Sequence, residues 1–137
     1  MIVKPDSYGS VLATQKIQST SFAGCYGVFI KTKFWNTVFH ISPTNEVLKA
    51  KLYDFLRIHE IKKCLQIHYH DLPPLPIKSK NYKYKEKTFD TRGRKVDFAD
   101  ILLGKNSISE INKRLSYNIV GINSDVFFFE NIEIIKL

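Results

Sequence analysis

Two short runs of β-branched and aromatic residues decide the fold: Tyr26-Gly27-Val28-Phe29-Ile30 and Phe34-Trp35-Asn36-Thr37-Val38-Phe39-His40-Ile41. Runs of this composition are typical of β-strands. They are separated by Lys31-Thr32-Lys33, which predicts a β-hairpin with these three residues as its loop. Such a hairpin returns the end of the second run to the start of the first.

Further strands are expected on both sides of this hairpin. A loose apolar alternation runs from Tyr8 to Ile17, and Lys63 to His70 places Leu65 and Ile67 on the face opposite Cys64. Two more strands are predicted near the end of the sequence, Tyr117 to Ile122 and Val126 to Leu137. The Val126–Phe129 segment is apolar on both faces, which is typical of a buried, central strand.

Two helices complete the predicted elements. Ser42 is a natural N-cap and Pro43 a natural first helical residue, and apolar positions at helical spacing then continue to about Glu60. Ser107-Ile108-Ser109-Glu110 forms a capping box at the start of a second, shorter helix. Residues 1–137 are therefore predicted to form one α+β domain, with a mainly antiparallel β-sheet or sandwich core and two main helices packed on it.

The segment from Asp71 to Lys87 breaks these patterns. Leu72-Pro73-Pro74-Leu75-Pro76 cannot supply a ladder of N–H donors, which indicates a long surface loop, with an edge hairpin as the alternative. Asp90-Thr91-Arg92-Gly93-Arg94 indicates a turn. Lysines alternate with Tyr82 and Tyr84 between residues 78 and 87. Four basic residues of this region are candidates for docking an acidic partner: Lys83, Lys85, Arg92 and Arg94.

Charge and composition limit the partners and the location of the protein. The formal net charge of +8 favours an acidic partner, either a nucleic acid, an anionic membrane surface or an acidic protein face. No apolar run is long enough for a membrane span, and the N-terminal residues lack the apolar region of a secretory signal. We therefore expect a cytoplasmic protein, or one that an injection apparatus delivers into a host cytosol, with Cys25 and Cys64 as free thiols.

One cysteine stands in a setting suited to nucleophilic catalysis. Cys25 follows Ser21-Phe22-Ala23-Gly24 and enters the first strand of the hairpin between Gly24 and Gly27. Glycine permits backbone angles that a Cβ atom forbids, so Cys25 could present its thiol and its backbone N–H to one carbonyl group. The hairpin places His40 nearby as a base. The alternative is a small buried cysteine and a strand-end histidine bonded to the following helix cap.

Ala23-Gly24-Cys25, followed by His40, Ser42-Pro43 and a helix, resembles the CheD-like glutamine deamidases, a family that includes the catalytic domain of cytotoxic necrotizing factor and Burkholderia lethal factor 1. The order of elements is similar from Gln15 to Leu137. Segments rich in glycine in CheD have no counterpart here, because Leu65 to His70 stands in their place. The resemblance implies a protein substrate that carries a reactive glutamine, without a cofactor.

The same resemblance implies the roles of individual residues. Cys25 would be the nucleophile, His40 the general base and acid, and Ser19 the residue that orients His40, with Thr20 as the alternative to Ser19. Gly24 and Cys25 would form the turn with the oxyanion donor. Hydrolysis would give glutamate, whereas a primary amine in place of water would give transglutamination. Such a protein would be a bacterial toxin, an effector or a divergent signalling enzyme.

Other interpretations remain open from the sequence. His68 and His70 share a strand face and, with Asp71, resemble part of a metal site, but no further ligands accompany them, and two strand histidines that line a groove explain them equally. The Lys- and Tyr-rich loop 78–87 is also typical of a surface that binds single-stranded nucleic acid. A non-catalytic interaction protein is the third interpretation.

Overall fold

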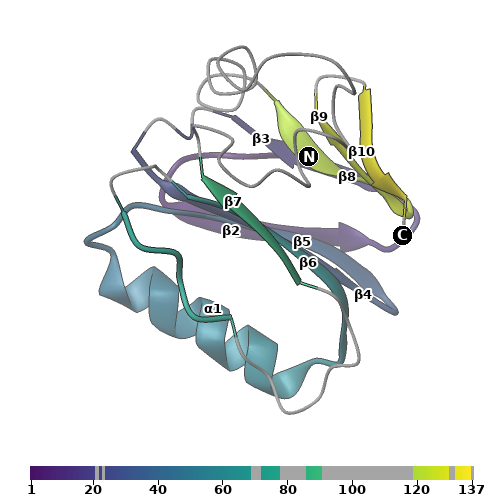
Figure 1. The fold of residues 1–137 in the computed structure, drawn as a ribbon. Helices are drawn as coiled ribbons and strands as arrows, with labels where there is room; N and C mark the ends of the chain where they lie inside the picture. The colour runs from purple at the N-terminus through teal and green to yellow at the C-terminus, as the bar shows by residue number, and fades with distance from the viewer. Residues whose placement is uncertain are drawn as a thin grey trace.

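The computed structural model describes residues 1–20, 22, 24–68, 72–77, 86–90, 119–129 and 132–136. These residues form three layers, with one helix, α1 (Glu46–Ile58), against a β-sheet and a second sheet on the opposite side of the first (Figure 1). The prediction of an α+β fold with a sandwich core is thereby confirmed. Of the two predicted helices, one is present in the described residues, and the other, at residues 107–115, lies outside them.

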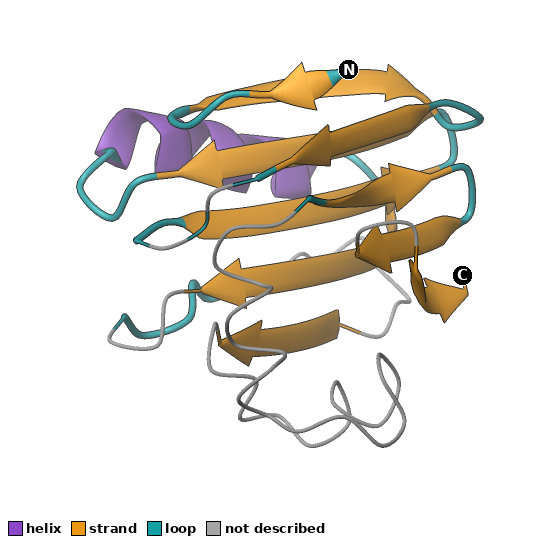
Figure 2. Cartoon of the chain, turned by 90° about the horizontal axis from the view of Figure 1, so that it is seen from above, coloured by secondary structure: helices purple, strands orange, loops and turns teal. Residues whose placement is uncertain are grey.

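The sheet beside the helix, called here the helix-side sheet, has five strands. In spatial order they are β2 (Ser7–Leu12), β5 (Trp35–Ile41), β4 (Tyr26–Thr32), β6 (Ile61–His68) and β7 (Glu86–Asp90). All neighbours are antiparallel except β6 and β7, which are parallel. Figure 2 shows how these strands lie side by side, with the helix behind one face of the sheet.

The second sheet, called here the far sheet, also has five strands. Their order is β1 (Ile2–Val3), β3 (Lys16–Ser19), β8 (Val120–Asn123), β9 (Val126–Phe129) and β10 (Ile132–Lys136). Only β1 and β3 among them are parallel. β9 has a neighbour on each side and buries Phe127 and Phe128, as its apolar sequence predicts.

The predicted hairpin is confirmed, and its alternation builds two core layers. β4 and β5 pair antiparallel with Tyr26 opposite Ile41 and Lys31 opposite Asn36. Because successive side chains of a strand point to opposite faces, Phe29 and Val38 pack between the sheets whereas Val28 and Phe39 pack toward α1. The loop is shorter than predicted, since Lys31 and Thr32 belong to β4.

Two predicted strands are each divided in the structure. The segment Tyr8–Ile17 forms β2 and β3, which belong to different sheets and are joined by a turn in which the Gln15 N–H donates to the Leu12 carbonyl. The segment Val126–Leu137 forms β9 and β10, which pair with each other. Folding back lets each strand bury one apolar face, which a single long strand could not do.

The helix begins three residues later than predicted. Its N-cap is Asn45, whose side chain accepts from the Leu48 N–H at 3.0 Å, and not Ser42. Ser42 instead donates its N–H and its hydroxyl to the carboxylate of Asp6. The helix ends at Ile58, before the predicted Glu60, and buries Leu48, Leu52 and Leu56 as the spacing predicts. No helix of the described residues is long and apolar enough to cross a bilayer.

The proline segment is held against the sheet although it forms no strand. Gln66 binds both polar groups of the Leu75 backbone, since its amide donates to the carbonyl at 3.0 Å and accepts from the N–H at 2.7 Å. The Tyr26 hydroxyl donates to the Pro73 carbonyl. Glu86–Asp90 is a strand, β7, so the predicted loop to Lys87 and turn at Asp90 were wrong at these residues.

A buried polar cluster joins the two sheets at the end of the sandwich where β4 finishes. The Lys31 ammonium donates to Asn36 Oδ1 (2.9 Å) and to the carbonyls of Ala13 (2.8 Å) and Ser124 (2.7 Å), and Asp125 lies 3.3 Å away. Asn36 donates to the same two carbonyls and to that of Gln15. These side chains of the helix-side sheet thus hold the β2–β3 and β8–β9 turns.

Replacing Lys31 with methionine tests this cluster. Lys31→Met keeps the apolar stem but removes three donors from buried acceptors, so the free energy of unfolding should fall by roughly 2–3 kcal/mol. Urea denaturation measures the change. Lys62→Met, at an exposed position of β6, should change stability by less than about 0.5 kcal/mol. Equal effects of the two substitutions would show that the cluster does not join the sheets.

Candidate active site

His40 lies between the two sheets and has no exposed surface. It is on β5, on the face that also carries Val38 and Asn36, and it pairs with Gly27 of β4 and Ser7 of β2. The alternation of β5 makes the side chain point toward the far sheet. A buried imidazole needs hydrogen-bond partners, and the far sheet supplies one.

Ser19 of β3 is that partner, as the family resemblance implies. Its Oγ lies 2.8 Å from His40 Nδ1 and donates its own proton to the Val3 carbonyl at 2.6 Å. Because the single hydroxyl proton is used toward Val3, Ser19 must accept from Nδ1–H of the neutral ring. The proton of neutral His40 therefore sits on Nδ1, and Nε2 carries a lone pair.

Nε2 of His40 is the one buried side-chain nitrogen or oxygen without a hydrogen-bond partner among the described residues. Burial lowers the pKa of His40 to about 4, against an ordinary value of 6.5, although the Asp6 carboxylate acts in the opposite direction. The ring is therefore neutral at neutral pH. A neutral imidazole with a free Nε2 lone pair can accept a proton, although the lowered pKa makes it a weaker base than an exposed histidine.

Cys25 lies at the entrance to β4, one residue before the strand and two before Gly27, which pairs with His40. The thiol is half-buried and free. Burial raises its pKa, and the Asp6 carboxylate raises it further. No hydrogen bond joins the thiol and the imidazole in the described part of the chain. The resting site therefore holds a neutral thiol and a neutral imidazole at the same end of the sandwich.

Phe22 covers the imidazole. Its ring is fully buried and stacks on His40 with the ring centroids 4.5 Å apart. The ring occupies the space above Gly27, where an added Cβ would lie 2.5 Å from Phe22 Cε1. Gly27 is thus required by the close approach of Phe22, which places an aromatic wall beside the base.

Gly24 does not have the role predicted for it. Its backbone lies outside the left-handed region, and an added Cβ would meet no atom within 4 Å. The prediction that Gly24 supplies angles forbidden to other residues is therefore wrong. The oxyanion donor at Cys25 stays a prediction.

Sequence reasoning missed Asp6, which lies next to this site. Its carboxylate accepts from the Ser42 hydroxyl, from the Ser42 N–H at 2.9 Å and from Asn45 at 3.2 Å, and the Ser42 bonds hold its pKa below the ordinary value. Its backbone is left-handed, with φ of 57°. Little in the sequence indicates this role of Asp6, because its hydrogen-bond partners, Ser42 and Asn45, lie 36 and 39 residues away.

The remaining predicted residues do not join this cluster. His68 Nδ1 is bonded to the Leu72 carbonyl at 2.9 Å, and the described residues contain no group of three side chains suited to hold a metal. Cys64 is buried on the helix side of β6 and forms no disulfide within the described residues. Several predicted residues lie outside the described part of the chain: His70, Asp71, Lys83, Lys85, Arg92 and Arg94.

Comparison of the chain with protein-family models, with curated proteins and with solved structures gives no match in any of the three. The interpretation of the site therefore rests on its geometry. A half-buried thiol, an imidazole with an unprotonated Nε2 and a hydroxyl bonded to Nδ1 lie at one end of the sandwich, and these are the types of group that acyl transfer at a cysteine uses.

The two glycines of the site provide a matched pair of substitutions. Gly27→Ala forces Phe22 away from His40 and should lower the free energy of unfolding by roughly 1–3 kcal/mol. Gly24→Ala meets open space and should change it by less than about 0.5 kcal/mol. Urea denaturation of both variants measures the difference. If Gly27→Ala is as stable as Gly24→Ala, Phe22 does not pack above Gly27.

Stability should depend on pH through His40. The folded protein holds the pKa near 4 and the unfolded chain near 6.5, so the unfolded state binds more protons between these values. The free energy of unfolding should therefore fall as the pH drops from about 6.5 to 4, by roughly 3 kcal/mol in total. His40→Gln should lose this contribution while carboxylate effects remain. Parallel pH profiles for the two proteins would contradict the lowered pKa.

Proposed function

We propose that this protein is a protein-glutamine deamidase, in which Cys25 attacks the side-chain carboxamide of a glutamine on another protein. The observation that carries the proposal is the arrangement at His40, where Ser19 fixes the Nδ1 proton and Nε2 is left without a partner at the end of the sandwich that holds Cys25. A buried polar atom without a partner is destabilising. Its retention is explained if Nε2 receives a proton from the nucleophile.

The reaction proceeds in two steps. Nε2 of His40 takes the thiol proton as Cys25 Sγ bonds to the carboxamide carbon, and His40 then gives that proton to the leaving nitrogen, which departs as ammonia. The product of this step is a thioester. His40 next takes a proton from water, the resulting hydroxide attacks the thioester carbon, and the Cys25 thiol is regenerated as the glutamate side chain leaves.

The pKa values of the resting site favour general-base catalysis over a preformed ion pair. The raised pKa of Cys25 and the lowered pKa of His40 keep both groups neutral. The proton moves from the thiol to His40 only as sulfur bonds to the substrate, because the substrate carbonyl then takes up negative charge that sulfur would otherwise carry alone. Ser19 supports this transfer because its hydroxyl accepts from Nδ1 in both charge states of the ring.

The choice of glutamine as substrate rests on the resemblance in Ala23-Gly24-Cys25 and His40 and on the charge of the chain. A net charge of +8 suits an acidic protein partner. Cys25 is half-buried, so part of its side chain is exposed to an approaching glutamine. Transglutamination is the outcome of the same thioester when a primary amine replaces water.

The direct test is mass spectrometry of candidate substrate proteins after incubation with wild type, Cys25→Ala and Cys64→Ala. Gln-to-Glu conversion is expected with wild type and with Cys64→Ala, because Cys64 is buried on the other side of the sheet. Cys25→Ala should give none, since it lacks the nucleophile. Conversion that persists in Cys25→Ala, or none with wild type across a broad proteome, would refute the proposed function.

Ser19 is tested as a positioning residue. Ser19→Ala removes the acceptor of Nδ1 and should lower kcat by about 10-fold to 100-fold with little change in KM. Ser19→Thr keeps the hydroxyl and should restore part of the rate. Thr37→Val, which removes a buried hydroxyl bonded to Ser10 on the helix-facing side of β5, is the matched control and should leave kcat unchanged. Equal kcat values for Ser19→Ala and wild type would exclude the orienting role.

A further inference from the structure

β2 is an edge strand without the usual protection against pairing. It is the first strand of the helix-side sheet, and within the described residues its outer edge pairs with no strand. Its sequence, Ser7 to Leu12, holds six residues with neither a proline nor a charge. Natural edge strands are commonly blunted by lysine, proline or a bulge, because a free edge offers unpaired N–H and C=O groups.

Exposed apolar side chains gather along this edge. Of the nine large hydrophobic residues exposed in the described chain, five form what is called here the β2 edge surface: Tyr8, Leu12, Phe34, Trp35 and Val47. Leu12 pairs with Trp35 and is 52% exposed, and Tyr8 stacks on Phe39 while remaining 48% exposed. Apolar residues gathered in this way, with charges at their rim, mark interaction sites.

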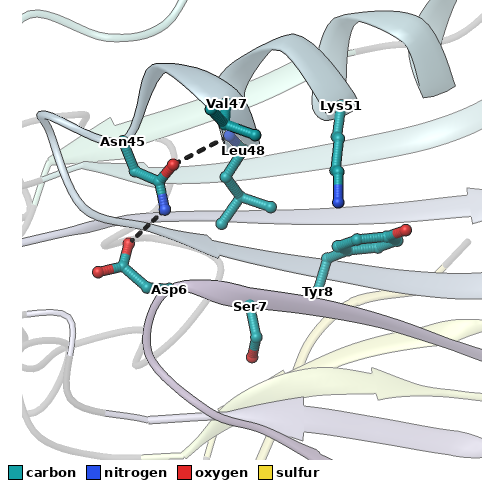
Figure 3. Close-up of a pocket in the computed structure, with 7 residues that line it drawn as sticks. All are labelled: Asp6, Ser7, Tyr8, Asn45, Val47, Leu48 and Lys51. Carbon is teal, nitrogen blue, oxygen red and sulfur yellow. Dashed lines mark hydrogen bonds between the residues drawn. The ribbon is translucent and has the colours of Figure 1, made fainter.

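A pocket of about 370 Å³ opens at one end of the edge surface, between β2 and the start of α1 (Figure 3). Asp6 and Asn45 close one end, and Val47 and Leu48 of the helix form an apolar side. In the figure the Lys51 side chain descends from α1 toward the ring of Tyr8. A strand added beside β2 would direct alternate side chains to the face of Tyr8, where this pocket lies.

Two lysines at the edge surface have no acidic partner in the described chain. Lys51 lies over the Tyr8 ring at 5.5 Å and Lys33 over the Phe34 ring at 5.4 Å, and neither forms an ion pair there. The Asp6 carboxylate at one end of the pocket accepts from Ser42 and Asn45, and Glu46 pairs with Lys49. The two lysines therefore carry positive charge that no carboxylate of the described residues neutralises in an ion pair.

We propose that β2 is a docking edge, which binds an extended acidic segment of the substrate protein as an added strand. Main-chain hydrogen bonds to β2 supply affinity, one apolar side chain enters the pocket, and carboxylates pair with Lys51 and Lys33. A second copy of this chain fits less well. Antiparallel pairing of two β2 strands would bring Lys51 of one copy toward Lys33 of the other, and each copy carries a net charge of +8.

The position of the edge also sets where the reactive glutamine lies, a point that rests on the proposed function. Ser7 begins β2 and pairs with His40, so the edge leads to the end of the sandwich that holds Cys25. A strand docked outside β2 is three strand spacings from β4, or about 14 Å, which about four extended residues span. The glutamine is therefore expected about four residues or more from the docked segment.

The test uses a synthetic peptide in which valine and isoleucine alternate with aspartate and glutamate, bound to Cys25→Ala protein. Hydrogen exchange of the β2 amides should slow on binding, and affinity should fall as salt increases. Leu12→Ser and Lys51→Glu should each weaken binding about tenfold or more. Two matched controls should bind as wild type: Ile58→Ser, at the other end of α1, and Lys62→Glu on β6.

Circular dichroism confirms that each variant is folded, and hydrolysis of a short glutamine peptide without a docking segment reports the chemistry separately. Loss of peptide binding in Leu12→Ser with unchanged hydrolysis of the short peptide supports the proposal. If no variant hydrolyses glutamine, the binding result still stands, because it does not depend on the proposed function. Peptide binding without slower exchange in β2, binding by Leu12→Ser equal to that of wild type, or a concentration-dependent dimer that Leu12→Ser abolishes would overturn the proposal.

Discussion

Every polar side chain that enters the space between the two sheets must find a partner on the facing sheet, and this constraint sets the register of the sandwich. At one end, Lys31 and Asn36 of the central hairpin bind carbonyls of the turns at residues 13–15 and 124. At the other end, His40 of the same hairpin binds Ser19. Between these ends lie apolar residues, Phe29 and Val38 among them. Apolar contacts tolerate a shift of one sheet against the other better than hydrogen bonds do. The polar ends therefore fix how the two sheets align, whereas the pairing of Gly27 with His40 between β4 and β5 places Cys25 at the same end of the sandwich as His40.

Only one of the two ring nitrogens of His40 has a hydrogen-bond partner, which distinguishes this site from the other end of the sandwich. Its Nδ1 is paired, whereas Nε2 is buried without a partner. Stacking on Phe22 at 4.5 Å supplies packing energy that offsets part of the lost hydration. The same burial depresses the pKa of the ring to about 4. Burial thus leaves Nε2 with a free lone pair, keeps the ring neutral and shields it from water.

The sequence was sufficient for the features that depend on neighbouring residues. The hairpin, the faces of β6 and the buried stripe of α1 follow from alternation and helical spacing, which are local. The errors come from distant contacts. Ser42 has the sequence of an N-cap, but Asp6 takes its donors from 36 residues away, and Tyr8–Ile17 passes from one sheet to the other without a break in its alternation. The bond between Ser19 and His40 joins different sheets, so no spacing rule predicts it, and only the family resemblance pointed to it.

Asp6 connects the electrostatics of the site with the edge of the sheet. Its carboxylate favours a proton on His40 and disfavours a thiolate at Cys25. For transfer of a proton from the thiol to the imidazole, these two influences oppose each other. Asp6 thus cannot activate the nucleophile by itself, and a proton moves only when a bound carbonyl takes up the charge that sulfur would carry. Because Asp6 also closes the pocket beside β2, an acidic segment docked there would add negative charge near His40. By the same opposition, that charge would favour the imidazolium and disfavour the thiolate of the proposed reaction, so docking would position the substrate without driving proton transfer by itself.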